Sequence, residues 1–98
     1  MTPEETALIL SAIAQPTRLE ILQLVAPYSR REGDSGLAAG EIARALGLAP
    51  ATLSFHLKDM TYKGLLVQTR HGRSVHYRAN LDELLRTLDF LVTEVCGG

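Results

Sequence analysis

The sequence lacks the features that mark membrane, secreted and disulfide-stabilised proteins. No segment approaches the roughly 18 consecutive apolar residues of a membrane-spanning helix. The single cysteine, Cys96, has no partner for a disulfide within the chain. The acidic start, MTPEET, lacks the basic region that opens a signal peptide. We therefore expect a cytoplasmic protein without a membrane partner.

Motifs that carry catalytic chemistry are also missing. The chain has no G-x-S-x-G elbow, no phosphate-cradling glycine loop and no H-E-x-x-H motif. Ser54 and His56 are two residues apart on a predicted helix, so their side chains do not face each other. These absences argue against an enzyme.

Charge is nearly balanced over the whole chain but not along it. The 98 residues include 10 Lys or Arg and 11 Asp or Glu, and this length predicts one domain with a modest core. Residues 51–78 hold five of the basic residues, only one acidic residue and all three histidines. One basic block in a near-neutral protein indicates a positive patch on one face, which suits a nucleic acid.

The clearest pattern is a pair of short helices joined at a glycine. Residues 41–46 and 50–64 repeat apolar positions every three or four residues. Gly47 suits a left-handed helix end, and Pro50 suits a first helical turn. This order is typical of a helix-turn-helix, whose second helix enters a DNA groove.

The second of these helices has two different faces. Leu53, Leu57 and Met60 form an apolar stripe, with Phe55 and Tyr62 beside it. Hydroxyls near the N-terminus and cations further along suit contacts with base edges and phosphates. An ordinary amphipathic helix with a solvated face would show the same pattern, so the neighbouring elements decide. The polar face carries Thr52, Ser54, His56, Lys58 and Lys63.

Beyond this helix the apolar spacing changes from helical to strand-like. Residues 66–70 and 74–78 are predicted to be two short strands, and His71-Gly72 between them is typical of a tight turn. A basic hairpin beside a recognition helix is a wing that can reach a phosphate or the minor groove. A plain solvated hairpin is the alternative. The basic residues at the tip are Arg70, His71 and Arg73.

Two helices are expected before the helix-turn-helix. The segment 2–5 carries an N-cap, a helical proline and a capping-box glutamate, and its helix runs to about residue 14. Another helix starts at Pro16, since the residue before a proline avoids helical geometry, and stops at Pro27. A polar loop over 28–36 and a short extended piece at 37–39 follow. The second helix is predicted to turn Leu19, Leu22, Val25 and Ala26 inward, supported by Ile21.

A last helix follows the hairpin. Asn80 is a suitable N-cap with Glu83 three residues later, and the helix runs to about Val95. Its apolar residues repeat at spacings of three and four. A domain this small cannot easily cover both this stripe and the first helix, in which Ala7, Leu8, Leu10, Ile13 and Ala14 are apolar. We therefore expect residues 1–14 and 81–96 to form a homodimer interface.

Several segments together resemble the ArsR/SmtB family of bacterial repressors, over nearly the whole chain. They are QPTRLEIL at 15–22, EIA at 41–43, LSFHLK at 53–58, KGLL at 63–66 and a G-R-x-x-x-Y-R wing. The resemblance implies a homodimer that binds a double-stranded operator and leaves it when an inducer arrives. By position, it places Thr52, Ser54 and His56 toward the operator and Arg70 and Arg73 in the wing.

The expected fold is therefore mainly α with a small β-hairpin. It is a dimeric winged helix-turn-helix with about five helices in a single domain, 1–98. Residues 41–64 form the helix-turn-helix and 65–79 the wing. The expected DNA contacts are Thr52, Ser54, His56, Lys58, Lys63, Arg70, His71 and Arg73.

The inducer site is where the chain departs from the family it resembles. The C-x-C of metalloid-sensing members is matched by Ala38-Ala39-Gly40, and the last helix lacks the histidine of zinc-sensing members. Cys96 stands where some arsenic-sensing members carry several cysteines, although trivalent arsenic prefers three thiolates. Arsenite, antimonite, a metal ion or another thiol-reactive signal are the candidate inducers there, and an inert cysteine is the alternative. His56, His71 and His76 are not spaced as a chelating set.

Two other functions stay open. One is a winged helix that serves as a protein-interaction or dimerisation module without sequence-specific DNA binding, which the acidic balance outside residues 51–78 would suit. The other is a metal-binding or redox module that acts through Cys96. The helix-turn-helix order and the basic wing favour a DNA-binding repressor.

Overall fold

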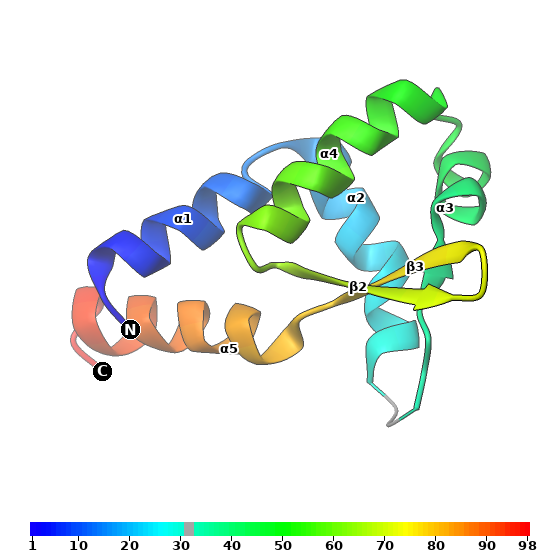
Figure 1. Ribbon diagram of the computed structural model, residues 1–98. Coiled ribbons are helices and arrows are strands. Elements are labelled where there is room, and N and C mark those ends of the chain that lie inside the picture. Colours follow the sequence, from blue (N-terminus) through cyan, green and yellow to red (C-terminus); the bar gives the residue numbers. More distant parts are fainter. Residues whose placement is uncertain (31–32) are drawn as a thin grey trace.

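A computed structural model describes residues 1–30 and 33–98 and confirms the winged helix-turn-helix fold (Figure 1). Within these residues the sheet has three strands in the order β1-β3-β2. Figure 1 shows α1 and α5 on one side of the molecule and α3 and the β2–β3 hairpin on the other. The helices are α1 (Pro3–Ile13), α2 (Pro16–Val25), α3 (Ala39–Leu46), α4 (Pro50–Tyr62) and α5 (Leu81–Phe90). The strands are β1 (Leu37–Ala38), β2 (Leu66–His71) and β3 (Ser74–Ala79), and the short helical turns are η1 (Ala26–Ser29) and η2 (Leu91–Val95).

Local sequence signals set three helix ends as predicted, whereas α3 starts two residues before the predicted residue 41 and α4 ends two residues before the predicted residue 64. The Thr2 hydroxyl accepts the N–H of Glu5, and the Glu5 carboxylate accepts the N–H of Thr2, which closes the capping box of α1. At α5, the Asn80 side chain accepts the N–H of Glu83. Gly47 ends α3 in the left-handed conformation, with φ of +66°. These caps mark the starts of α1 and α5 and the end of α3.

The helix α2 ends at Val25, within one residue of the prediction, but the chain does not enter a loop at Pro27. It continues as η1, where the missing N–H of a proline near the start leaves no bond unmade. The predicted loop over 28–36 therefore starts later, and its residues 31–32 lie outside the described part. The Ser29 hydroxyl accepts the N–H of Ala79 at 2.7 Å, which ties η1 to the base of β3.

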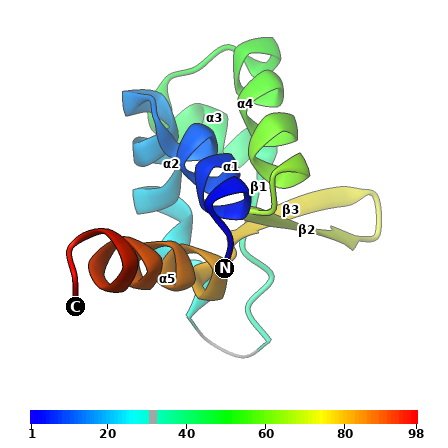
Figure 2. The ribbon, with the colours of Figure 1, turned by 90° about the vertical axis from the view of Figure 1, so that its left-hand side faces the viewer.

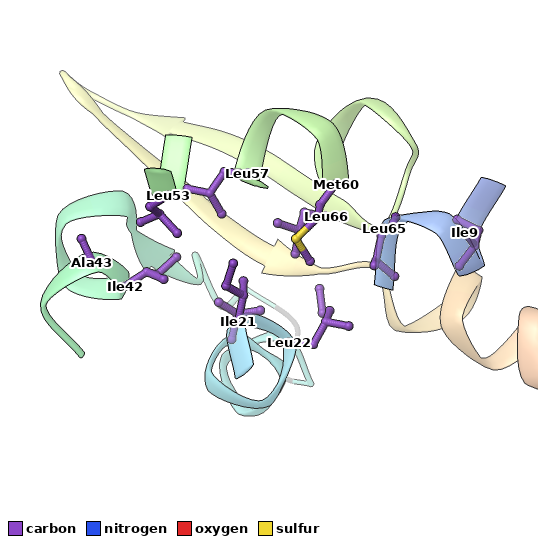
Figure 3. Close-up of a cluster of buried hydrophobic side chains, with 13 residues drawn as sticks. Ile9, Ile21, Leu22, Ile42, Ala43, Leu53, Leu57, Met60, Leu65 and Leu66 are labelled. Atoms are coloured by element: carbon purple, nitrogen blue, oxygen red, sulfur yellow. The ribbon is translucent and has the colours of Figure 1, made fainter. Parts of the chain in front are cut away.

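The hydrophobic core lies between α4, α2, α3 and the base of the sheet. Figure 3 shows Leu53, Leu57 and Met60 of α4 pointing toward Ile21 of α2, which confirms the predicted stripe on α4. Close packing of this stripe fixes the depth at which α4 lies on the body of the protein. The core comprises Ile9, Ala12, Ile21, Leu22, Val25, Ile42, Ala43, Leu53, Leu57, Met60, Leu65, Leu66 and Ala79.

The inner face of α2 is rotated relative to the prediction. Ile21, Leu22 and Val25 are buried as expected, but Leu19 is 51% exposed and Arg18 is only 3% exposed. Arg18 therefore completes the inward stripe at helical spacing. An arginine in this position requires acceptors for its N–H groups, because burying an unpartnered charge is very costly.

The first and last helices leave apolar surface uncovered in one chain. α1 buries Thr6, Ile9 and Ala12, while Leu8 and Leu10 stay exposed. On α5 and η2, an uncovered stripe has exposed fractions between 49% and 68%. We call it the α5 stripe; it consists of Leu85, Leu88, Val92 and Val95. Among the described residues no single helix is long and apolar enough to cross a membrane, and only α1 with α2 and η1, bent by 92°, would qualify as a pair.

The β2–β3 hairpin is the predicted wing. Its antiparallel register runs from Leu66↔Ala79 to His71↔Ser74, whereas β1 pairs only with the base of β3. The turn consists of Gly72-Arg73, one residue later than predicted. Gly72 has φ of +63°, which the first residue of a type II′ turn requires. This geometry places Arg73 at the tip of a two-stranded ribbon.

The rotated face of α2 can be tested by a matched pair of substitutions. Ile21→Ala should lower the free energy of unfolding by about 2–5 kcal/mol, because it opens a cavity in the core. Leu19→Ala should cost well under 1 kcal/mol, roughly the effect of a surface change. Urea unfolding at one fixed protein concentration measures both. Equal losses would show that Leu19 packs inward as the sequence predicted.

Candidate nucleic-acid interface

The polar side of α4 has an exposed part and a partly buried part. Thr52, Ser54 and Lys58 are exposed, as expected for residues that meet a ligand. His56 and Lys63 are only half-exposed, because this flank of α4 faces α2 and the end of α1. The five residues predicted to form one polar face therefore divide into two groups.

Arg18 holds the partly buried flank in place. Its Nε donates to Nδ1 of His56 at 3.0 Å, and its Nη1 donates to the carboxylate of Asp59. The same Nη1 lies 3.4 Å from the carbonyl oxygen of Ala12, in the last turn of α1. One guanidinium from α2 thus joins α1 to α4. Sequence reasoning did not assign Arg18 a role, although it belongs to the Pro-Thr-Arg segment that carries the family resemblance.

The same network sets the charge of the groups around it. The Arg18 hydrogen bond, with help from Lys63, holds the pKa of Asp59 below its ordinary value. Lys63 Nζ lies 3.0 Å from the Asp59 carboxylate, so its ammonium is engaged within the protein. Burial, and then the nearby Arg18 charge, lower the pKa of His56. His56 is therefore neutral at pH 7, and because Nδ1 accepts from Arg18, its proton lies on Nε2.

The wing presents its cations at the tip. Arg70, His71 and Arg73 are all exposed. The rings of His71 and His76 lie edge to face with centroids 4.8 Å apart, so the two histidines do approach across the hairpin. Nδ1 of His76 is buried and has no hydrogen-bond partner among the described residues. In Figures 1 and 2 the wing extends away from α5.

Two aromatic residues of α4 are more exposed than the sequence indicated. Phe55 is 67% exposed and Tyr62 is 87% exposed, although both were placed beside the apolar stripe. A helical wheel would have shown the difference, because at 100° per residue Phe55 lies about 160° from both Leu53 and Leu57. The outer face of α4 is therefore partly aromatic.

The predicted inducer residue lies far from this surface. Cys96 is a free, exposed thiol directly after η2. In the described part of one chain, no three His, Cys, Asp or Glu side chains gather as a metal site. The sensing role of Cys96 therefore stays a prediction.

Comparisons with known proteins agree with this geometry. A family model for the helix-turn-helix domain matches residues 13–69, more than half of the chain. The HTH-type transcriptional regulator CmtR of Mycobacterium tuberculosis is 36% identical over 84 residues. That match covers 86% of this chain and 65% of CmtR, so the chain spans a little under two thirds of this relative's length.

Solved structures share both the fold and its extent. An ArsR-like transcriptional regulator from Rhodococcus sp. RHA1 superimposes with a TM-score of 0.77 at 26% identity, covering 96% of this chain and 82% of that one. The homodimeric winged helix-turn-helix DNA-binding domain of Mb0332 from Mycobacterium bovis, a possible ArsR-family regulator, gives 0.71 at 28% identity, covering 93% and 79%. The chain belongs to the ArsR family of helix-turn-helix proteins.

Membership of the ArsR family gives the elements of this chain their usual names. The family consists of transcriptional regulators and is not an enzyme family. α3 and α4 are the two helices of the helix-turn-helix of this ArsR-family chain, α4 takes the position of the recognition helix in that fold, and β2 and β3 are the wing. The Arg18 network therefore lies directly behind the recognition helix.

The lowered pKa of His56 makes folding stability depend on pH. The unfolded chain binds a proton at His56 near pH 6.5, about its ordinary pKa, whereas the folded chain does so only at lower pH. The contribution of neutral His56 is thus complete above about pH 6.5 and is lost as the pH falls below it. Urea unfolding at pH 7.5 and 5 should show this decrease.

A matched pair of glutamine variants isolates the source of that decrease. In His56→Gln the amide oxygen can accept from Arg18 but does not titrate, so the decrease should become smaller. Thr52→Gln, at an exposed position of α4, introduces the same side chain without removing a histidine and should retain the decrease of the unsubstituted protein. A full decrease in His56→Gln would contradict the role given to this histidine.

Proposed function

We propose that this protein is a homodimeric transcriptional repressor that binds operator DNA and leaves it when an inducer arrives. One observation carries the proposal: α4 lies on the body through its apolar stripe and turns hydroxyls and a lysine outward. The basic wing extends from the sheet next to it (Figure 1). Family membership supports the same conclusion.

The exposed residues of α4 and the wing have different roles in this proposal. Thr52 and Ser54, near the start of α4, contact bases or the adjacent phosphates. Lys58 lies one turn further along the helix and neutralises a phosphate. Arg70, His71 and Arg73 at the wing tip contact phosphates or the minor groove. These contacts position the protein on the duplex, while the first turns of α4 supply most of the sequence preference.

His56 and Lys63 contribute in a more limited way than free surface residues would. His56 is neutral and held by Arg18, so it offers a fixed Nε2–H donor rather than a positive charge. Lys63 is paired with Asp59, which reduces its value as a phosphate ligand. In this proposal both act as supporting contacts at the edge of the interface.

The dimer is formed by residues 1–14 and 81–96. The α5 stripe has the 3-4-3 spacing of one helix face, and Leu8 and Leu10 on α1 are exposed as well. Apolar surface of this extent is typical of an interface between subunits. Two recognition helices related by a two-fold axis would contact half-sites about one helical turn of DNA apart, roughly 34–36 Å.

Release from the operator is assigned to the C-terminal end of the dimer interface. Cys96 directly follows Val95 of the α5 stripe, so a ligand on its thiol would alter packing between subunits. Arsenite, antimonite and thiol-reactive metal ions are the candidates. Two copies supply two thiols, one fewer than trivalent arsenic prefers. Operator binding with and without arsenite, repeated with Cys96→Ser, tests this part.

DNA binding is tested by fluorescence anisotropy on DNA from the protein's own upstream region, with random DNA as comparison. Arg73→Ala should weaken binding to all sequences and reduce the slope of log K against log salt by about 1, the value for one phosphate contact. Arg30→Ala removes the same charge from an exposed position directly after η1, outside α4, the wing and the dimer interface, and should leave the slope unchanged. An unchanged slope in Arg73→Ala would remove the wing from the interface. No selective binding by the unsubstituted protein would favour the protein-interaction module.

The dimer interface can be tested independently of DNA. Leu88→Glu places a charge in the middle of the α5 stripe, where dimerisation would have to bury it, so the variant should sediment as a monomer. Leu19→Glu is the matched control, because Leu19 is exposed to the same degree but lies outside the stripe. Sedimentation velocity measures both. A dimeric Leu88→Glu would exclude this face as the interface.

A further inference from the structure

Phe55 is an apolar residue that is exposed, although large apolar side chains are usually buried. Its ring is 67% exposed in the second turn of the recognition helix. On the helical wheel it lies on the outer face with Lys58 and Tyr62, opposite the buried stripe of Leu53 and Leu57. A phenyl ring exposed among hydroxyls and a cation is available for an apolar contact with a group outside the chain.

The dimer proposed above does not provide that contact. The α5 stripe and the exposed residues of α1 form the dimer face. In Figures 1 and 2, α1 lies between α4 and α5, so the outer face of α4 points away from that interface. The partner of Phe55 must therefore approach from the side on which the polar residues of α4 are exposed.

The neighbours of Phe55 identify the chemistry of that partner. Ser54 precedes it, Thr52 lies one turn before it and Lys58 one turn after it, and all three are exposed. Hydroxyls and a cation suit the polar edges and phosphates of a duplex. Among the groups that a base pair presents in the major groove, the apolar one is the C5-methyl of thymine.

We propose that Phe55 contacts the methyl group of a thymine in each operator half-site and so sets the sequence preference at that position. The proposal rests on the DNA-binding function proposed above and adds a specificity residue to it. The Phe55 ring lies edge to face with the ring of His56, with centroids 5.9 Å apart. Because Arg18 holds His56, one side of the phenyl ring is supported before DNA arrives.

Tyr62 provides a matched control on the same helix. It is also an exposed aromatic residue of the outer face, but it lies seven residues later, about 10 Å along the helix axis. That distance is close to the width of the major groove, about 12 Å. With the first turns of α4 against the bases, Tyr62 reaches the backbone, where its hydroxyl suits a phosphate.

The test uses the full chain and a DNA duplex selected by the protein from random sequences. Each thymine of the half-site is replaced in turn by deoxyuridine, which lacks only the methyl group. The unsubstituted protein should lose affinity at one thymine per half-site by about fourfold, the value of one buried methylene. Phe55→Ala should bind the thymine and deoxyuridine duplexes equally, whereas Tyr62→Ala should retain the fourfold ratio while binding both more weakly.

A leucine at position 55 provides a more conservative variant than alanine. Phe55→Leu keeps an apolar group, so part of the thymine preference should return, and thermal unfolding should show that all variants are folded. A Phe55→Ala variant that retains the full thymine ratio would overturn the methyl contact while leaving the repressor function intact. If the unsubstituted protein selects no sequence at all, both the methyl contact and the proposed function are wrong.

Discussion

The position of the recognition helix depends on one buried guanidinium. Arg18 is almost fully enclosed, and its acceptors come from the last turn of α1 and from two positions on α4. A buried cation is tolerated only while these acceptors stay in place, because losing one leaves charge uncompensated in a poorly solvated site. The buried stripe of α4 and the Arg18 hydrogen bonds to His56 and Asp59 together fix how this helix lies on the body of the protein.

Because of this arrangement, some polar residues of α4 make contacts within the chain and only the others stay exposed to a partner. His56, Asp59 and Lys63 serve the interior, and their hydrogen bonds and charges are largely satisfied within the chain. The outer flank of α4 is the part that stays exposed to a partner. It has fewer polar residues than the sequence indicated, and two of its exposed residues, Phe55 and Tyr62, are aromatic. The advantage of this arrangement is preorganisation. A helix that is already held in one orientation loses less conformational entropy when it binds a rigid partner.

The order of elements could be predicted because it depends on local signals. Capping at Thr2 and Asn80, the glycine at position 47 and the change from helical to strand spacing each act within a few residues. The exposed positions of Thr52, Ser54, Lys58, Arg70, His71 and Arg73 also agree with the prediction. DNA contact by these residues stays a prediction.

One wrong prediction concerns which side chains of α2 are buried, where contacts with other helices outweigh the polarity of the residue. General hydrophobicity placed Leu19 inside and gave Arg18 no place in the core, but α4 and α1 supply acceptors for Arg18 that only the folded chain brings together. Phe55 was placed beside the apolar stripe for a different reason, because its residue type was given more weight than its angle on the helical wheel. In a helix a one-residue shift rotates the side chain by 100°, so a face assigned by composition can be wrong while the helix is right.

The sheet distributes stability unevenly along the wing. β1 pairs with β3 at two positions, Leu37↔Tyr77 and Ala38↔His76, and so supports only the base of the hairpin. The tip is therefore a ribbon of two strands. A ribbon of this kind contributes little to global stability, and most changes at its tip are therefore tolerated by the fold. Gly72 is the exception, since the turn requires its positive φ. The tip can consequently change in sequence at little folding cost, so the number and placement of its cations can vary while the fold stays the same.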